Sequence, residues 1–487
     1  MVFSTIIFLF RFLPITLALY YLAPAKLKNT VLFLCSLVFY CWGEVRFFPV
    51  MVALILINYI SGLCIEHFDP KPALRRTFLL VALIGSLGML FYFKYANFVL
   101  RSANALLGTA FAEIQGIGTL PLGISFYTFQ TLSYSIDVYR RDVKAERNII
   151  DFGAYVVMFP QLIAGPIVKY RDVSNQLHVY RHRYSLQQLE EGMTLFTFGL
   201  AKKVLLADAI GALWTDIIGV ADSPSTTFVG LANASTPLVW LGIIAYSLQL
   251  YFDFSGYSLM AMGLGQMLAL PVPRNFDLPY TARSVSEFYR RWHITLGTWF
   301  RDYVYIPLGG SRNGNARTVL SLTVVWFFTG LWHGASWNFV LWGVMLLGFI
   351  LLEKFCIGNF LKGHKVLSHV YLLFVIPQTW VIFRITRLKD IVAYFSRLFP
   401  FFGTHSAVSA QDALKLLSSY WWLLLLAVFF CLPQPRRFYE KHRGSLLVQL
   451  PLFLLFWVCV YFIATSSGNA FLYSLSLIHI SEPTRPY

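Results

Sequence analysis

The sequence has little charge: Asp, Glu, Lys and Arg together make up 13% of its 487 residues, against roughly a quarter in an ordinary soluble domain. Hydrophobic residues make up 57% and aromatic residues 17%, which is more apolar surface than one globular core can bury. A disordered chain and a water-soluble enzyme are therefore excluded. The composition predicts a polytopic membrane protein in which much of the apolar surface contacts lipid.

Acidic residues are scarce, because 23 Asp and Glu face 39 Lys and Arg, which leaves a formal net charge of +16. In a membrane protein such an excess usually reflects cytoplasmic loops beside an anionic leaflet. The basic residues stand in short scattered runs, without a compact water-soluble binding domain. We therefore expect no nucleic acid among the partners.

Motifs of several enzyme classes are missing. There is no GxSxG elbow, no P-loop and no GxGxxG, and the pair His178 and His182 lacks the Glu of HExxH. The six cysteines lie in or beside apolar segments without ligand-like spacing, so neither a disulfide framework nor a metal site is predicted. No covalent Ser or Cys nucleophile is indicated, which favours direct transfer between two bound substrates.

Long uncharged runs dominate the chain. A helix that crosses a ~30 Å hydrocarbon slab needs ~20 apolar residues, and by this measure we predict about eleven to thirteen membrane segments in an all-α helix bundle. The first run continues past Arg11 and Pro14 without a small-residue cleavage site, which favours a retained signal anchor. The predicted segments are 12–25, 30–43, 47–65, 77–93, 114–136, 194–220, 240–252, 254–271, 318–332, 335–352, 366–383, 421–433 and 445–464.

The chain shows no internal repeat, linker or low-complexity tract, so we predict a single transmembrane domain over residues 1–473. The remaining stretch, 474–487, reads SLSLIHISEPTRPY and resembles the translation of a sequencing adaptor. We expect this tail to be non-native and to contribute nothing to function.

The segment 152–168 differs from the other apolar runs. It is short, contains Pro160 and Pro166, and has basic runs on both sides. Positive flanks at both ends predict a re-entrant hairpin whose ends are both cytoplasmic. Non-helical backbone at that depth needs cover from protein or a water-filled cavity, so this segment should border an internal cavity. A tilted full span is the alternative.

Asp253 interrupts a long and otherwise almost uncharged stretch. An ionisable group at such depth costs a few kcal/mol and normally faces the bundle interior beside a partner. Asp253 is therefore a candidate substrate-binding or pore residue, and a buried aspartate that serves packing alone is the alternative.

A polar segment from 274 to 317 follows, and Ser284 precedes Glu287 by three residues, as in a capping box. Apolar residues after it recur at steps of three and four, which predicts one amphipathic helix lying along the membrane interface. Arg290 and Arg291 belong to it, and His293 stands beside its aromatic stripe. His293 points inward on one interpretation and is an ordinary interfacial histidine on the other.

His333 is the one readily titratable side chain in the 35 residues 318–352. At 1.5 Å per residue this stretch would form ~52 Å of helix, which is too long for one crossing and must break. Gly330 and Gly334 flank the expected break. A buried neutral imidazole can act as a general base toward a hydroxyl, whereas a packed histidine bonded to a backbone carbonyl is the alternative.

At these residues the sequence closely resembles the membrane-bound O-acyltransferase (MBOAT) family, and within it the branch of bacterial alginate O-acetyltransferases. The resemblance covers almost the whole chain. It rests on LPLGISFYTFQ (120–130), FPQLIAGPIVKY (159–170), GLAKKVLLAD (199–208), YFDFSGYS (251–258), RRWHITLGTWFRDYVYIPLGG (290–310) and TGLWHGASWNFVLWG (329–343).

The resemblance implies a catalytic role for His333 and a second active-site role for His293. It further implies a central cavity bordered by re-entrant and interfacial helices, with Trp332, Asp253, Arg290, Arg291 and Gln161 as candidate substrate-binding residues. His333 would take a hydroxyl proton while His293 and Trp332 polarise the acyl carbonyl.

The implied donor is a cytoplasmic thioester, for which acetyl-CoA is expected, and no cofactor is expected to stay bound. The implied acceptor is an exported polysaccharide such as alginate. The expected partners are a periplasmic acetyltransferase and the export machinery, and the expected location is the bacterial inner membrane. Transfer of D-alanine or of a longer acyl chain is one alternative. A transporter without bond chemistry is the other, although we find no inverted repeats.

Overall fold

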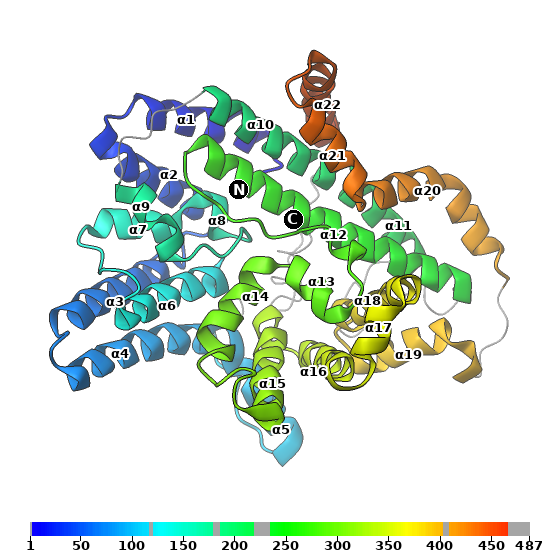
Figure 1. Cartoon of the computed structure of the whole chain (residues 1–487), viewed down its shortest axis with the longest axis horizontal. Coiled ribbons are helices and arrows are strands. Elements are labelled where there is room, and N and C mark those ends of the chain that lie inside the picture. Colours follow the sequence, from blue (N-terminus) through cyan, green and yellow to red (C-terminus); the bar gives the residue numbers. More distant parts are fainter. Residues whose placement is uncertain (1, 116–119, 179–185, 219–233, 403–408, 466–487) are drawn as a thin grey trace. The chain divides into compact units, whose positions relative to one another are not determined.

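The computed structural model describes residues 2–115, 120–178, 186–218, 234–402 and 409–465. These residues are helical almost throughout, and the single β-type contact among them is an isolated bridge between Phe276 and Trp292. The predicted all-α class is confirmed (Figure 1). The tail 474–487 lies outside the described residues, so its prediction stays open.

The chain divides into two compact units. The first comprises Met1–Gly199 and Tyr257–Arg274, and the second comprises Leu200–Gly256 and Asn275–Tyr487. This division follows contacts within the chain and leaves open whether 1–473 folds as the single domain that we predict.

The first unit is built from short and medium helices and the C-terminal part of the long helix α12 (Thr236–Met267). Its other helices are α1 (Leu13–Leu22), α2 (Lys28–Gly43), α3 (Phe48–His67), α4 (Pro72–Leu90), α5 (Ala96–Leu107), α6 (Ile124–Arg140), α7 (Ile149–Val157), α8 (Phe159–Leu162), α9 (Tyr170–His178) and most of α10 (Leu186–Ala201).

The second unit contains the N-terminal part of α12 and the helices that follow it in the chain. They are α13 (Val285–Arg291), α14 (Ile294–Phe300), α15 (Gly314–His333), α16 (Trp337–Leu352), α17 (Gly358–Gly363), α18 (Lys365–Arg384), α19 (Leu388–Leu398), α20 (Gln411–Phe430), α21 (Pro433–His442) and α22 (Leu446–Thr465), with α11 (Asp208–Ile218) before α12.

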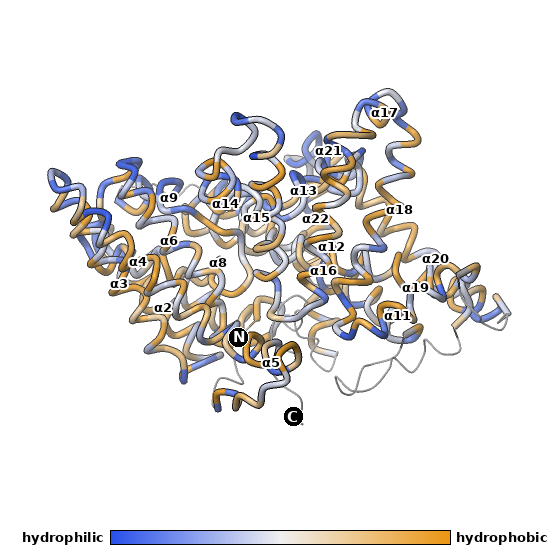
Figure 2. Tube along the Cα trace, turned by 90° about the horizontal axis from the view of Figure 1, so that it is seen from below, coloured by the Kyte–Doolittle hydropathy of each residue, from blue (hydrophilic) through white to orange (hydrophobic). Residues whose placement is uncertain are grey.

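Seven helices among the described residues are long and apolar enough to cross a membrane, which makes the chain a multi-pass membrane protein. This number is below our eleven to thirteen. The segments 240–252 and 254–271 account for part of the difference, because they belong to the one helix α12. The seven spans are Phe48–His67, Pro72–Leu107, Thr236–Met267, Trp337–Gly363, Lys365–Arg384, Gln411–Phe430 and Leu446–Thr465. Figure 2 shows α3 and α18 as largely hydrophobic along their length.

The segment 152–168 forms a hairpin. Helix α7 has nine residues, or about 13 Å at 1.5 Å each, and it ends at Met158, whose backbone is non-helical (ψ 112°). A full span needs ~30 Å, so the tilted-span alternative is wrong. The predicted neighbouring cavity stays a prediction, since the cavity described below belongs to the other unit.

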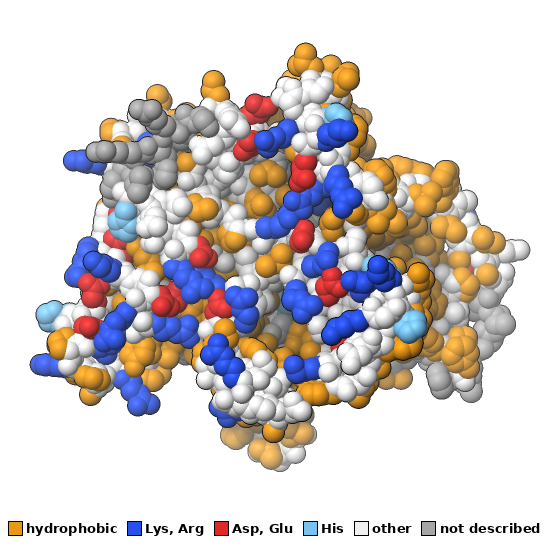
Figure 3. Space-filling view, viewed as in Figure 1, with side chains coloured by type: hydrophobic (Ala, Val, Ile, Leu, Met, Phe, Trp, Pro, Cys, Tyr) orange, Lys and Arg blue, Asp and Glu red, His pale blue; other side chains and the backbone are white. Residues whose placement is uncertain are grey.

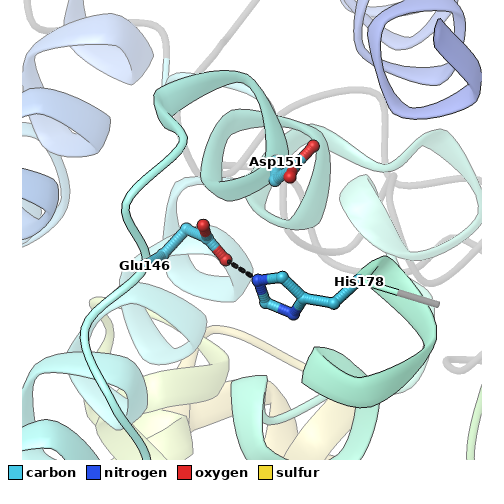
Figure 4. Close-up of side chains that lie close together, drawn as sticks. All are labelled: Glu146, Asp151 and His178. Carbon is cyan, nitrogen blue, oxygen red and sulfur yellow. Dashed lines mark ion pairs between the residues drawn. The ribbon is translucent and has the colours of Figure 1, made fainter. Parts of the chain in front are cut away.

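The two ends of this hairpin meet at Glu146 (Figure 4). Tyr170 Oη donates to Glu146 Oε2, and His178 Nε2 lies 2.8 Å from the same oxygen. Asp151 is close by. A carboxylate oxygen of Glu146, a carboxylate oxygen of Asp151 and a ring nitrogen of His178 lie within 4.8 Å of one another. The shared contact brings the residues before α7 next to the end of α9. His182 lies outside the described residues.

Both ends of the hairpin should therefore face the cytoplasm, because each carries excess Lys and Arg next to a membrane segment. We expect a membrane-impermeant maleimide to leave Lys144→Cys and Asp172→Cys unlabelled in intact cells and to label both after permeabilisation. Labelling of either position from outside would contradict the re-entrant assignment.

Helices α15 and α16 form the tight pair that presents His333. The predicted break is confirmed, since α15 ends at His333 and the backbone is extended at Gly334. Gly330 lies in the last turn of α15, beside the break. A Cβ at Gly330 would collide with the Phe339 carbonyl, and a Cβ at Gly343 would collide with that of Trp326. These two glycines let the helix backbones touch.

The predicted interfacial helix begins as expected but is divided. Ser284 caps α13 by accepting the Glu287 amide at 3.0 Å, which confirms the capping box. The helix ends after Arg291, and α14 starts at Ile294. The prediction of one continuous helix is wrong, because Asp277 N donates to the Arg291 carbonyl (2.9 Å) and Asn275 O accepts from Ile294 N (3.0 Å).

Candidate active site

A cavity of about 1010 Å³ lies in the second unit. Its wall is formed by α13 and α14, the C-terminal half of α15, and residues of α16, α17 and α18. His293 and His333 both line it, although they are far apart in the sequence. The two histidines singled out by sequence therefore contribute to the same cavity.

His333 sits at the end of α15 among aromatic rings. It is 5% exposed, and its ring meets Trp342 and Phe383 edge-on at centroid distances of 5.1 and 5.2 Å. These rings line the cavity with it. An aromatic wall lowers the local dielectric, which strengthens any hydrogen bond made there.

Trp332 lies beside both histidines. Its ring is 5.0 Å from that of the adjacent His333 and 5.6 Å from that of His293, both nearly perpendicular. It is 2% exposed and packs next to the cavity wall without being part of it. Trp332 thus connects the two histidine rings through direct packing.

His293 occupies a strained backbone position between α13 and α14. Its φ and ψ are 49° and 51°, a left-handed conformation that a residue with a Cβ seldom adopts. The backbone bonds from Asn275 and Asp277 to the residues on either side hold it there. The side chain is 3% exposed, and burial lowers the pKa of His293 to about 3. Its imidazole is therefore neutral at physiological pH.

Asn275 contacts His293 through its side-chain oxygen, and sequence reasoning missed it. Asn275 is fully buried, and its Oδ1 lies 3.2 Å from His293 Nδ1. The same oxygen accepts Thr295 N at 3.1 Å and Thr295 Oγ1 at 2.9 Å. No periodicity or motif marks this asparagine, so only the tertiary contact reveals it.

Positive charge predominates on the cavity wall. Five basic side chains line it, against the two carboxylates of Glu287 and Glu353. Both carboxylates are engaged by α13: Glu287 lies 2.6 Å from Arg291, and Glu353 accepts the amides of Val285 and Ser286. The basic residues are Arg283, Arg290, Arg301, Lys354 and Lys362. Figure 3 shows Lys and Arg side chains gathered over α13, α14 and α17.

The remaining predicted binding residues lie off the cavity wall. Arg291 is held by Glu287 and by Thr281 Oγ1 (3.1 Å), unlike Arg290, which is exposed and lines the cavity. Gln161 belongs to the first unit, where it is fully buried and its amide Nε2 donates to the Tyr155 carbonyl at 2.6 Å. Substrate contact by Arg291 or Gln161 stays a prediction.

Asp253 forms part of a buried ion cluster. Lys203 Nζ lies 2.8 Å from Asp253 and 2.6 Å from Asp208, and Asp253 is fully buried in α12. Burial of a carboxylate is tolerated when a cation faces it. The ion pair supplies the partner that we expected for a buried Asp253, and its role in substrate binding stays a prediction.

Several known proteins are similar to this chain over much of its length. Residues 140–388 match the model of the membrane-bound O-acyltransferase family. A probable alginate O-acetylase of Azotobacter vinelandii is 41% identical over 82% of this chain and 78% of its own length. Another, of Pseudomonas syringae, is 45% identical over 69% and 63%. A peptidoglycan O-acetyltransferase of Helicobacter pylori is 30% identical over 97% of each chain.

Proposed function

The chain belongs to the membrane-bound O-acyltransferase family and is a multi-pass membrane acyltransferase, and from that premise we propose that it transfers acetyl groups toward an exported, alginate-like polysaccharide. The observation that carries the site is the pair of buried histidines His293 and His333 on the wall of one cavity. The basic residues of the cavity wall support the choice of donor. The names of the relatives support the choice of acyl group and acceptor.

Acetyl is the group favoured by the comparisons. Each of the three relatives is named for acetyl transfer, and those named for alginate have 41% and 45% identity, against 30% for the one named for peptidoglycan. We therefore propose alginate or a similar uronic-acid polysaccharide as the final acceptor, and peptidoglycan as the second candidate.

The proposed chemical step is direct attack of an acceptor hydroxyl on a thioester. His333 takes the hydroxyl proton as general base, the oxygen forms the new ester bond to the acetyl carbon, and the carbon–sulfur bond breaks to release a thiolate. The aromatic wall around His333 excludes water, which suppresses hydrolysis of the thioester. No covalent enzyme intermediate is required.

The donor proposed is acetyl-CoA. The five basic residues of the wall outnumber the two engaged carboxylates, and guanidinium and ammonium groups bind phosphates strongly. A donor that carries phosphates near its thioester arm would place them against these side chains. We expect no cofactor that stays bound between turnovers.

The proposed setting is the bacterial inner membrane. A cytoplasmic donor and an exported polysaccharide lie on opposite sides of it, so a periplasmic acetyltransferase and the export machinery are the expected partners. The seven apolar spans are consistent with an integral position between these compartments.

The central test supplies radiolabelled acetyl-CoA to membranes that contain the exported glycan and the partner proteins, with or without this chain. We expect labelled glycan only when the chain is present. Label from D-alanine or a longer acyl donor instead would replace the acetyl assignment. Movement of unlabelled solute without any new ester would support a transporter.

Arg290 provides a sharper test of the donor. Replacing it with alanine should raise the KM for acetyl-CoA about fivefold to tenfold, which is about 1–1.4 kcal/mol, because one phosphate-binding charge is lost. The value of kcat should change little. Arg312→Ala is the matched control, since Arg312 is exposed and lies outside the cavity wall. An unchanged KM in the Arg290 variant would contradict the phosphate role.

A further inference from the structure

The contacts of Asn275 determine which nitrogen of His293 carries the proton. Thr295 N is a backbone amide and can only donate, so the Asn275 atom that it contacts must be the oxygen. The same atom faces His293 Nδ1 at 3.2 Å. Because an amide oxygen can only accept, Nδ1 must donate and therefore bears a proton.

A neutral imidazole carries one proton, so the other ring nitrogen holds a lone pair. We infer that Asn275 is a positioning residue that keeps His293 in the Nδ1-protonated form, so that Nε2 serves in acyl transfer as a hydrogen-bond acceptor, while His333 takes the hydroxyl proton. This inference rests on the proposed function. It replaces our expectation that His293 polarises the acyl carbonyl, because Nε2 without a proton has nothing to donate.

The surroundings of Asn275 suit a positioning role. Its Oδ1 accepts three bonds, while its Nδ2 is a buried donor without a partner among the described residues. A buried unmet donor costs about 1–3 kcal/mol. Aspartate has the same shape and could keep all three accepted bonds, but its buried carboxylate would place a charge beside the ring. Asparagine accepts these bonds without adding a charge next to His293.

The two side chains differ in their effect on the ring. A carboxylate on Nδ1 stabilises the imidazolium and raises the pKa of the histidine, whereas an amide does not. The described contacts of the ring are the Asn275 amide, Phe254 of α12 at 4.8 Å and Trp332 of α15. The other groups on the same cavity wall that titrate or carry charge are His333, Glu287, Glu353, Arg283, Arg290, Arg301, Lys354, Lys362, Tyr289, Tyr305 and Cys356.

The protonation of His293 determines whether activity rises or falls with pH. In the wild type, the pKa of His293 is about 3, so Nε2 stays unprotonated from pH 5 to 9. In Asn275→Asp, the carboxylate beside Nδ1 raises the pKa of His293. More of the imidazole is then protonated as the pH falls, so an acceptor role predicts that activity is lost toward pH 5.5.

The test compares wild type, Asn275→Asp and Thr295→Val as full-length protein in nanodiscs. The rate of acetyl transfer from acetyl-CoA is measured between pH 5 and 9. Carbethoxylation of His293 by diethyl pyrocarbonate, which attacks neutral imidazole, is followed by mass spectrometry over the same range. Thr295→Val is the matched control, because it removes one bond to Asn275 Oδ1 and leaves the histidine contact.

We expect the folded Asn275→Asp protein to lose severalfold in both readouts as the pH falls from 8 to 5.5, whereas the wild type keeps both. Thr295→Val should keep the shape of the wild-type profile. Superimposable profiles for Asn275→Asp and wild type would overturn the inference. So would a variant that gains activity as the pH falls, since this requires His293 to donate.

The proposed acetyl transfer and the positioning role of Asn275 can be refuted independently. If His333→Ala is inactive while Asn275→Asp matches wild type, only the role of Asn275 is lost. If carbethoxylation shifts with pH in Asn275→Asp but transfer does not, His293 is neutral as described and its acceptor role in transfer is overturned.

Discussion

Replacing His333 with alanine is expected to lower the rate of acetyl transfer by about 10² to 10⁴, the contribution typical of a positioned general base. The fall should appear in kcat, because the imidazole acts on the reacting hydroxyl rather than on donor binding. His333 is 5% exposed and is the last residue of α15, so it does not lie in the middle of the helix. The protein should therefore still fold. The measurement is the initial rate with radiolabelled acetyl-CoA, normalised to monodisperse protein.

His364→Ala is the matched control for this variant. His364 follows α17, is exposed, and contacts the carbonyl of Phe360 through Nδ1 at 3.0 Å, so its loss should leave the rate unchanged. A well-folded His333→Ala protein with wild-type rate would remove His333 from the mechanism. His333→Gln separates the roles further, since glutamine fills the space but cannot take a proton at neutral pH.

Replacing Lys203 with methionine is expected to destabilise the protein by about 3–5 kcal/mol, the usual result of removing one partner from a buried ion pair. Lys203 Nζ lies within 3 Å of both Asp253 and Asp208, and Asp253 is fully buried. The readout is the midpoint of thermal unfolding in nanodiscs, together with the yield of monodisperse protein.

A double variant separates the ion pair from a substrate role. Lys203→Met combined with Asp253→Asn removes both charges of the pair and should recover most of the lost stability. If Asp253 serves packing alone, the folded double variant keeps its transfer rate. Lys202→Met is the control at the neighbouring position, where Nζ approaches Ser255 Oγ at 3.5 Å. An unchanged midpoint for Lys203→Met would refute the structural role.

Sequence reasoning was accurate where the signal is local. The Ser284 cap and the end of α15 at His333 are confirmed, because a capping side chain bonds within one turn and a helix much longer than the bilayer must end. The hairpin at 152–168 was also accessible, since two prolines and basic flanks lie within a short stretch.

Sequence reasoning was wrong where a distant segment competes for the same groups. The predicted helix through His293 is divided because Asn275 and Asp277 take up backbone groups of Arg291 and Ile294. Gly330 flanks the end of α15 as expected and is in addition a contact point with α16. Asp253 has in Lys203 the partner that its burial required, and its substrate contact stays a prediction. The residues that divide the helix, Asn275 and Asp277, lie outside it, so its own periodicity does not reveal them.

Composition and local pattern by themselves determined that this chain is an all-helical membrane protein. They also singled out His293, beside an aromatic stripe, and His333, within a long uncharged stretch. These properties depend on the transfer energy of apolar runs and on bonds within a helical turn, both of which are carried by neighbouring residues. The tertiary structure alone decided that His293 and His333 share a cavity and that Asn275 faces Nδ1 of His293. The proton on an imidazole follows the acceptor beside it, and only folding brings that acceptor into place.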